Sequence, residues 1–142
     1  MKGMKMFNGI KGVFIRVYNI EAATEKYLSI LGGKLIQRHK FEDLGFDTSV
    51  IEFEDDSFIE IIAPIDASGP VQKALDKFGE GVHLVAMNND DPSQTVASLR
   101  KMSIKLINDA GEDSPIAQQI FIHPKELNGM MALVAGTPVD EK

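Results

Sequence analysis

Apolar and polar residues alternate at the start of the chain and then repeat at helical spacing. Val13, Ile15 and Val17 fall at every second position, which is the period of a strand with one apolar face. Over residues 20–31 the apolar positions recur as they would on one face of a helix. Gly32-Gly33 then supplies the left-handed backbone at which helices commonly end. The pattern predicts a strand followed by a helix.

Three strand-like runs come next, over residues 34–41, 48–53 and 57–63. Turn-forming DLG and EDDS stretches separate these runs, as expected between neighbouring antiparallel strands. Beyond them, apolar residues on one helical face lead up to two glycines. We therefore expect a short amphipathic linker helix within residues 66–80.

The second half of the chain repeats the order of the first. An apolar strand runs from Gly81, a capped helix begins near Asp91, and strands are predicted around Leu106, Phe121 and Met131. A Lys-Leu-Ile sequence follows the helix in both halves. Such self-similarity indicates a duplicated supersecondary unit.

The repeat predicts an α+β fold in a single domain over residues 1–142. Two βαβββ modules, at residues 8–65 and 81–136, would pair into a curved mixed sheet around a concave cleft, with the linker helix at 66–80 between them. A concave face is the expected place for a small-molecule ligand.

Composition removes several classes of function. The chain has no cysteine, which excludes disulfides, thiol nucleophiles and zinc–thiolate sites. Its formal charge is −6 and its basic residues are scattered, which disfavours nucleic acid as a partner. No apolar stretch approaches the length of a signal-peptide core or a membrane span. We expect a cytoplasmic protein with no nucleic-acid or membrane partner.

Four segments carry a family resemblance that covers residues 11–134. They read VFIRVYNIEAATEKYLSILG, FIEIIAP, GEGVHLVAM and FIHPKELNGMMALV. With these the chain resembles the vicinal-oxygen-chelate superfamily, which includes glyoxalases, bleomycin resistance proteins and dioxygenases, and within it the methylmalonyl-CoA epimerases. The resemblance implies the glyoxalase-like fold and a homodimer.

Epimerases of this family hold one divalent metal with four side chains, and the resemblance carries those positions onto this chain. They fall on Gly12, Glu60, Leu84 and Leu133, and a further catalytic acid of the family falls near Thr48. Three of the four ligand positions therefore have no metal-binding side chain. One carboxylate alone does not hold a transition metal. We predict a protein with no metal and no cofactor.

Glu60 is the predicted catalytic residue. By strand alternation it shares the cleft face with Phe58, and Phe14, Leu84 and Leu133 would face it in the family fold. Burial among apolar groups raises a carboxyl pKa, which suits proton transfer near neutral pH. The alternative is a leftover ligand, paired with Arg16 or hydrogen-bonded, that takes no part in catalysis.

Four further polar residues have both a binding and a structural interpretation. Arg16 could hold an anionic ligand or pair with an acid such as Glu60 or Glu52, and we expect the internal pair. His123 and Lys125 could contact a ligand at the rim of the cleft, or form a turn fixed by proline. Alternation turns His83 away from the cleft, which favours a structural histidine with satisfied hydrogen bonds.

Two functions follow from these residues. One is a metal-independent isomerase or lyase that acts on a small carbonyl or acyl-thioester compound, with Glu60 as acid or base. The other is a non-catalytic protein that binds or sequesters an apolar small molecule, as metal-free bleomycin resistance proteins of the resembled family do.

Overall fold

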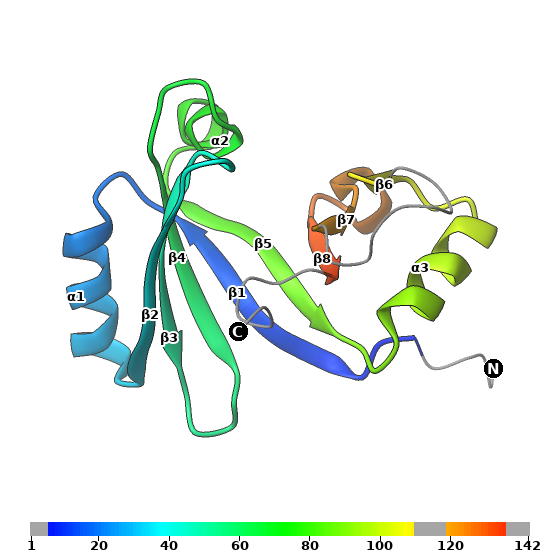
Figure 1. Cartoon of the computed structure of the whole chain (residues 1–142), viewed down its shortest axis with the longest axis horizontal. Coiled ribbons are helices and arrows are strands. Elements are labelled where there is room, and N and C mark those ends of the chain that lie inside the picture. The colour runs from blue at the N-terminus through cyan, green and yellow to red at the C-terminus, as the bar shows by residue number, and fades with distance from the viewer. Residues whose placement is uncertain (1–5, 110–118, 136–142) are drawn as a thin grey trace. The chain divides into compact units, whose positions relative to one another are not determined.

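The structure, a computed structural model, describes residues 6–109 and 119–135 of the chain. The first half contains β1 (Gly9–Arg16), α1 (Ile20–Leu31), β2 (Lys34–Phe41), β3 (Phe46–Glu52), β4 (Phe58–Pro64) and α2 (Pro70–Phe78). The second half contains β5 (Gly81–Asn88), α3 (Pro92–Lys101), β6 (Leu106–Ile107), β7 (Ile120–Ile122), the 3-10 helix η1 (Pro124–Leu127) and β8 (Ala132–Ala135). Figure 1 shows these elements along the chain.

The chain divides into two compact units. The first unit comprises residues 12–83, and the second comprises residues 1–11 with 84–142. In the first unit the strand order is β2-β3-β4-β1, with β1 parallel to β4 and the other pairs antiparallel. In the second unit the order is β5-β8-β7-β6, with β5 parallel to β8 and the other pairs antiparallel. The prediction of an α+β fold with two βαβββ modules is confirmed.

A polar side chain and a glycine set the two ends of helix α1. The Asn19 side chain accepts a hydrogen bond from the Ala22 backbone N–H at 3.0 Å, and this satisfies one donor of the first turn. At the other end Gly32 has a φ of 79°, which a residue with a side chain adopts only at a cost. The predicted helix over residues 20–31 is confirmed to the residue.

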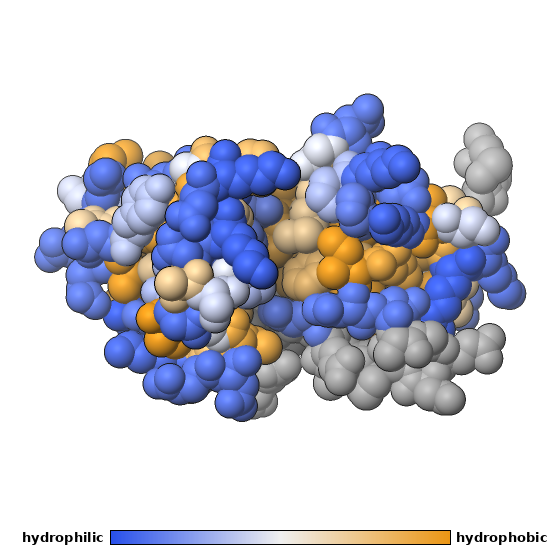
Figure 2. Space-filling view, turned by 90° about the horizontal axis from the view of Figure 1, so that it is seen from above, coloured by the Kyte–Doolittle hydropathy of each residue, from blue (hydrophilic) through white to orange (hydrophobic). Residues whose placement is uncertain are grey.

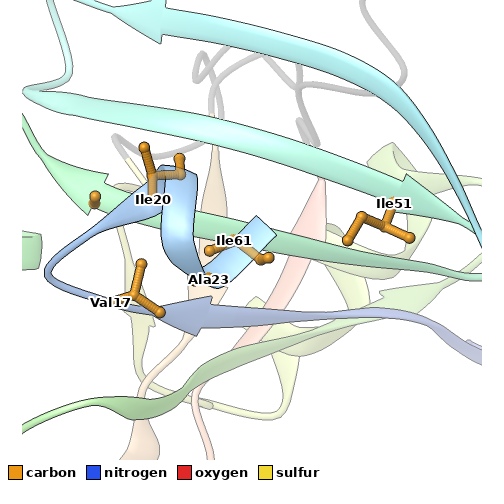
Figure 3. Packing of buried hydrophobic residues seen from close by; sticks show 6 residues of the cluster. Val17, Ile20, Ala23, Ile51 and Ile61 are labelled. Carbon is orange, nitrogen blue, oxygen red and sulfur yellow. The ribbon is translucent and has the colours of Figure 1, made fainter. Parts of the chain in front are cut away.

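The core of the first unit lies between α1 and one face of the strands. Its buried residues are Val17, Ile20, Ala23, Ile51, Ile61 and Ala63. Figure 3 shows Ile20 and Ala23 of α1 near Ile61 of β4, with Ile51 of β3 farther along the sheet. Burying one such aliphatic side chain stabilises the fold by roughly 1.5–3 kcal/mol. This packing fixes which residues of β3 and β4 face away from α1.

The second unit repeats this arrangement with α3. The Asp91 side chain caps the helix by accepting from the Gln94 N–H at 3.1 Å. The buried cluster here consists of Val96, Leu99, Ile120, Ile122, Ala132 and Val134. Alternation along β8 then turns Leu133 away from α3.

Element boundaries in the middle of the chain differ slightly from those predicted. Strand β3 begins at Phe46 rather than at residue 48, because the DLG turn closes earlier and Phe46 already pairs with Pro64. The linker helix is present as α2.

Figure 2 shows a mainly hydrophilic face with smaller hydrophobic areas. Over the described ranges, 6–109 and 119–135, no helix is long and apolar enough to cross a membrane.

Candidate functional site

Strand register brings the predicted site residues of the first unit onto one face. Phe14 of β1 lies opposite Glu60 of β4, and Gly12 lies opposite Phe58. Thr48 of β3 pairs with Ile62, so its side chain shares this face one step from Glu60. Ile61, the residue between Glu60 and Ile62, packs toward α1 instead. Gly12, Phe14, Thr48, Phe58 and Glu60 thus form a single group, here called the Glu60 face.

The Glu60 carboxyl is buried and has no hydrogen-bond partner among the described residues. Its side chain is fully buried, at 0% exposure, and neither of its oxygens makes a hydrogen bond to any described residue. Burial disfavours the charged form and raises the pKa of Glu60 to about 7, against a smaller opposing influence of the Thr48 hydroxyl. That hydroxyl lies close but forms no hydrogen bond of ordinary geometry, and it too has no partner in the described chain. Burial therefore decides the proton affinity of Glu60.

Gly12 and Phe58 pack too closely for a side chain at residue 12. A Cβ atom built on Gly12 would lie 2.6 Å from the Phe58 carbonyl oxygen and 2.7 Å from two carbons of the Phe58 ring. The Phe58 ring also meets the Phe14 ring edge to face, with centroids 6.0 Å apart. Sequence reasoning missed this contact, although an isolated glycine inside a strand is a known signal of close backbone approach.

We predicted that Arg16 pairs with an acid such as Glu60 or Glu52, and for Glu60 this is wrong, because neither of its oxygens has a hydrogen-bond partner among the described residues. Arg16 instead donates from Nε to the Gly79 carbonyl at 2.8 Å and from Nη1 to the Val82 carbonyl at 2.7 Å. Its guanidinium also lies over the Phe78 ring, 5.5 Å from the centroid. These backbone acceptors satisfy the cation at the turn between α2 and β5. Arg16 therefore holds this turn against β1, and the Glu60 carboxyl has no hydrogen-bond partner in the part of the chain that the structure describes.

His83 is not the satisfied histidine that alternation suggested. Its Nδ1 atom is buried and has no hydrogen-bond partner within the described residues. Burial, and secondarily the charge of Arg16, lowers the pKa of His83 to about 4, so the ring is neutral at physiological pH. Strand alternation could predict the direction of this side chain but not the polar groups around it.

The remaining predicted residues lie in the second unit. Leu84 and Leu133 are buried, and both fall in strand phase with the face turned away from α3. His123 caps η1 by accepting the Lys125 N–H on Nδ1 at 3.0 Å, and Lys125 is exposed. This geometry matches the turn interpretation of these two residues.

A pocket in the first unit lies away from the Glu60 face. It has a volume of about 540 Å³, between the end of α1 and the β3–β4 turn. Its lining consists of Leu31, Gly33, Lys34, Glu52, Phe53 and Glu54. None of these is a predicted site residue, whereas Glu60 combines full burial with a raised pKa, a combination that marks candidate functional groups. We therefore place the candidate site at Glu60.

Comparison with known proteins assigns the family. Residues 13–121 match the family described as the Glyoxalase/Bleomycin resistance protein/Dioxygenase superfamily. The chain belongs to this superfamily. The predicted resemblance is thereby confirmed, and so is its glyoxalase-like fold.

The chain is also similar in sequence to two individual proteins. The chain is 28% identical over 126 residues to the uncharacterized protein YqjC of Bacillus subtilis, covering 87% of this chain and 89% of that protein. It is 24% identical over 121 residues to the mitochondrial methylmalonyl-CoA epimerase of Mus musculus, covering 84% and 67%.

Two solved structures show the same fold. The methylmalonyl-CoA epimerase of Mycobacterium tuberculosis superimposes with a TM-score of 0.80 at 24% identity, covering 100% of this chain and 97% of that one. That of Streptomyces coelicolor, in complex with 2-nitronate-propionyl-CoA, gives 0.77 at 22% identity and covers 89% and 95%.

The residues of this glyoxalase-superfamily chain do not fit the metal that epimerases of the family hold. In the part of the chain that the structure describes, no three His, Cys, Asp or Glu side chains come together as a metal site. Residue 12 has no room for a donor, because the Phe58 ring and carbonyl occupy that space. Positions 84 and 133 carry buried leucines. A single carboxylate does not hold a transition metal.

Proposed function

We propose that this protein is an isomerase or lyase that transfers a proton at a carbon beside a carbonyl, with Glu60 as the acid and base and without a metal. The observation that carries the proposal is the fully buried Glu60 carboxyl, which has no hydrogen-bond partner over residues 6–109 and 119–135 and whose pKa burial raises to about 7. A group with this pKa is divided between its two protonation states near neutral pH. It can therefore both accept and return a proton.

The proposed step conserves atoms and charge. The Glu60 carboxylate takes the proton from the carbon, and the C–H electron pair moves onto the carbonyl oxygen to give an enolate. In an isomerase the protonated Glu60 then returns the proton to the opposite face of the planar enolate carbon, which inverts the configuration there. In a lyase the enolate instead expels a leaving group, with its bonding electrons, from the neighbouring carbon. The Thr48 hydroxyl, which is buried and unpartnered among the described residues, is the nearby donor that could stabilise the enolate oxygen.

Similarity supports a small acyl-thioester or related carbonyl compound as the substrate class. The relatives include methylmalonyl-CoA epimerases, and one was solved with 2-nitronate-propionyl-CoA. Glu60 shares its face with the buried apolar residues Phe14, Phe58 and Ile62. These neighbours suit a short acyl chain better than a polar one. The homodimer stays a prediction from the resemblance, which sedimentation velocity would test.

The experiment follows exchange at carbon. Acyl-CoA esters and 2-oxo compounds are incubated in D₂O with the wild type or Glu60→Gln, and ¹H NMR follows loss of the α-proton signal. We expect exchange with one substrate class in the wild type and a loss of roughly 100-fold or more in Glu60→Gln. Equal exchange by both proteins would contradict the role of Glu60.

Metal addition is the matched control. A ligand that binds only the folded state must stabilise it. Because we expect no metal to bind, addition of Co, Ni, Mn or Zn should leave the melting temperature and the exchange rate unchanged. A stoichiometric, stabilising ion would contradict metal-independent catalysis.

The second candidate is a non-catalytic small-molecule binding protein. It is favoured by the apolar character of the Glu60 face, where Phe14 and Phe58 pack edge to face. Thermal shift with acyl-CoA esters, 2-oxo aldehydes and hydrophobic drugs separates the two functions. Stabilisation by a ligand whose protons never exchange would support this candidate.

A further inference from the structure

A tight contact on the Glu60 face involves Phe58, a residue with no assigned chemistry. Phe58 is buried at 3% exposure and lies two residues before Glu60, on the same face of β4. Its carbonyl and ring occupy the space into which a side chain at Gly12 would project, at 2.6 and 2.7 Å. The Phe58 ring also meets, edge to face, the ring of Phe14, which lies opposite Glu60 in register.

We propose that Phe58, which packs over Gly12, is the positioning residue of the site. Its side chain keeps water away from the Glu60 carboxyl and leaves no room for a second polar side chain at residue 12 of β1. The proposal rests on the proposed function of Glu60 and assigns the residue that makes this function available. Phe58 itself touches no reacting atom.

Packing explains why the two residues act together. Any side chain at residue 12 would meet not only the flexible end of a ring but also the Phe58 backbone, which cannot turn aside. A donor at residue 12 and the phenyl ring at residue 58 are therefore mutually exclusive. With Gly12 in place, the Phe58 ring packs close to β1 and meets the Phe14 ring, so that two buried aromatic rings share the face on which Glu60 lies. An apolar wall of this kind leaves a carboxyl without solvation.

Carboxyl labelling tests the proposal without any substrate. A water-soluble carbodiimide with an amine nucleophile modifies carboxyl groups that water reaches, and peptide mass spectrometry measures the rate at Glu60. In the wild type Glu60 should be protected. In Phe58→Ala its labelling should rise at least about tenfold, because truncation opens the Glu60 face to water.

Phe46→Ala is the matched control. Phe46 is also a buried phenylalanine on the same face of the first unit, but it pairs with Pro64, away from Glu60. Its truncation should loosen the core to a similar degree and leave the labelling of Glu60 near the wild-type rate. Phe58→Leu, which keeps most of the volume, should fold even where Phe58→Ala does not, and should give a smaller increase.

Two results would overturn the proposal. One is an unchanged labelling rate at Glu60 in folded Phe58→Ala, or in Phe58→Leu if the alanine variant does not fold. The other is an equal increase in Phe46→Ala, which would mean that general loosening exposes Glu60. Failure of the proposed function would look different, since either the wild type would show no exchange or Glu60→Gln would keep the wild-type exchange rate, whatever the labelling rates.

Discussion

The two βαβββ modules build their helix-covered faces alike but differ on the opposite faces. In the first, Ile61 and Ala63 of the last strand pack on α1, and in the second, Ala132 and Val134 pack on α3. On the opposite face of that strand the first module carries Glu60, next to Ile61, whereas the second module carries Leu133, next to Ala132 and Val134. The duplicated pattern repeats the core, whereas the opposite face has a buried carboxyl in the first module and a buried leucine in the second.

The largest expected effect comes from making the second module like the first. Leu133→Glu places a carboxyl on a strand position that is 1% exposed, and no feature of the sequence prepares that position for a polar group. We expect a loss of roughly 4 kcal/mol in the free energy of unfolding at neutral pH, measured by denaturant titration. Leu133→Met, which keeps the volume, should cost less than about 1.5 kcal/mol. Equal stability of Leu133→Glu and wild type would mean that the two modules do not differ as described.

The converse change removes the charge from the first module. The pKa of Glu60 is raised from 4.5 to about 7 in the folded protein, so Glu60 stabilises the fold below pH 4.5 and this contribution is lost as pH rises through 7. Glu60→Gln should therefore match the wild type in acid and exceed its unfolding free energy by roughly 3 kcal/mol above pH 7. His83 titrates in both proteins, so its contribution cancels in the difference. A constant difference across this pH range would rule out the raised pKa.

A smaller effect is expected at the close approach of β1 and β4. Gly12→Ala should lower the unfolding free energy by about 2 kcal/mol, because a Cβ there meets the Phe58 backbone and the strands must separate. Gly69→Ala is a suitable control, since the nearest atom to a Cβ at Gly69 is 3.5 Å away and its φ of −74° suits alanine. That variant should cost less than about 1 kcal/mol. Equal costs would show that residue 12 has room for a side chain.

Sequence patterns predicted what depends on local periodicity. The bounds of α1 and β2 follow from alternation, helical spacing and the glycines between them, and the same alternation placed Phe14, Phe58 and Glu60 on one face. The alternation also determines which face of a strand is buried, because a shift of one residue in register would move every side chain to the opposite face of the sheet.

What the patterns could not predict are polar contacts between segments distant in the chain. Arg16 uses the carbonyls of Gly79 and Val82, more than sixty residues away, and a backbone acceptor leaves no mark on residue identity. The unpartnered Nδ1 of His83 was missed for the same reason. The contact between Gly12 and Phe58 was predictable in principle, because a glycine inside a strand often marks a close neighbour.

The central claim is that burial on one face of the first module makes Glu60 a group that titrates near neutral pH. Its direct test is a pH titration of the wild-type protein labelled with ¹³C at the glutamate side-chain carboxyl, with Glu60→Gln used to assign the Glu60 signal. The account predicts that this signal titrates with a pKa of about 7. A pKa for Glu60 near the ordinary 4.5 would contradict it.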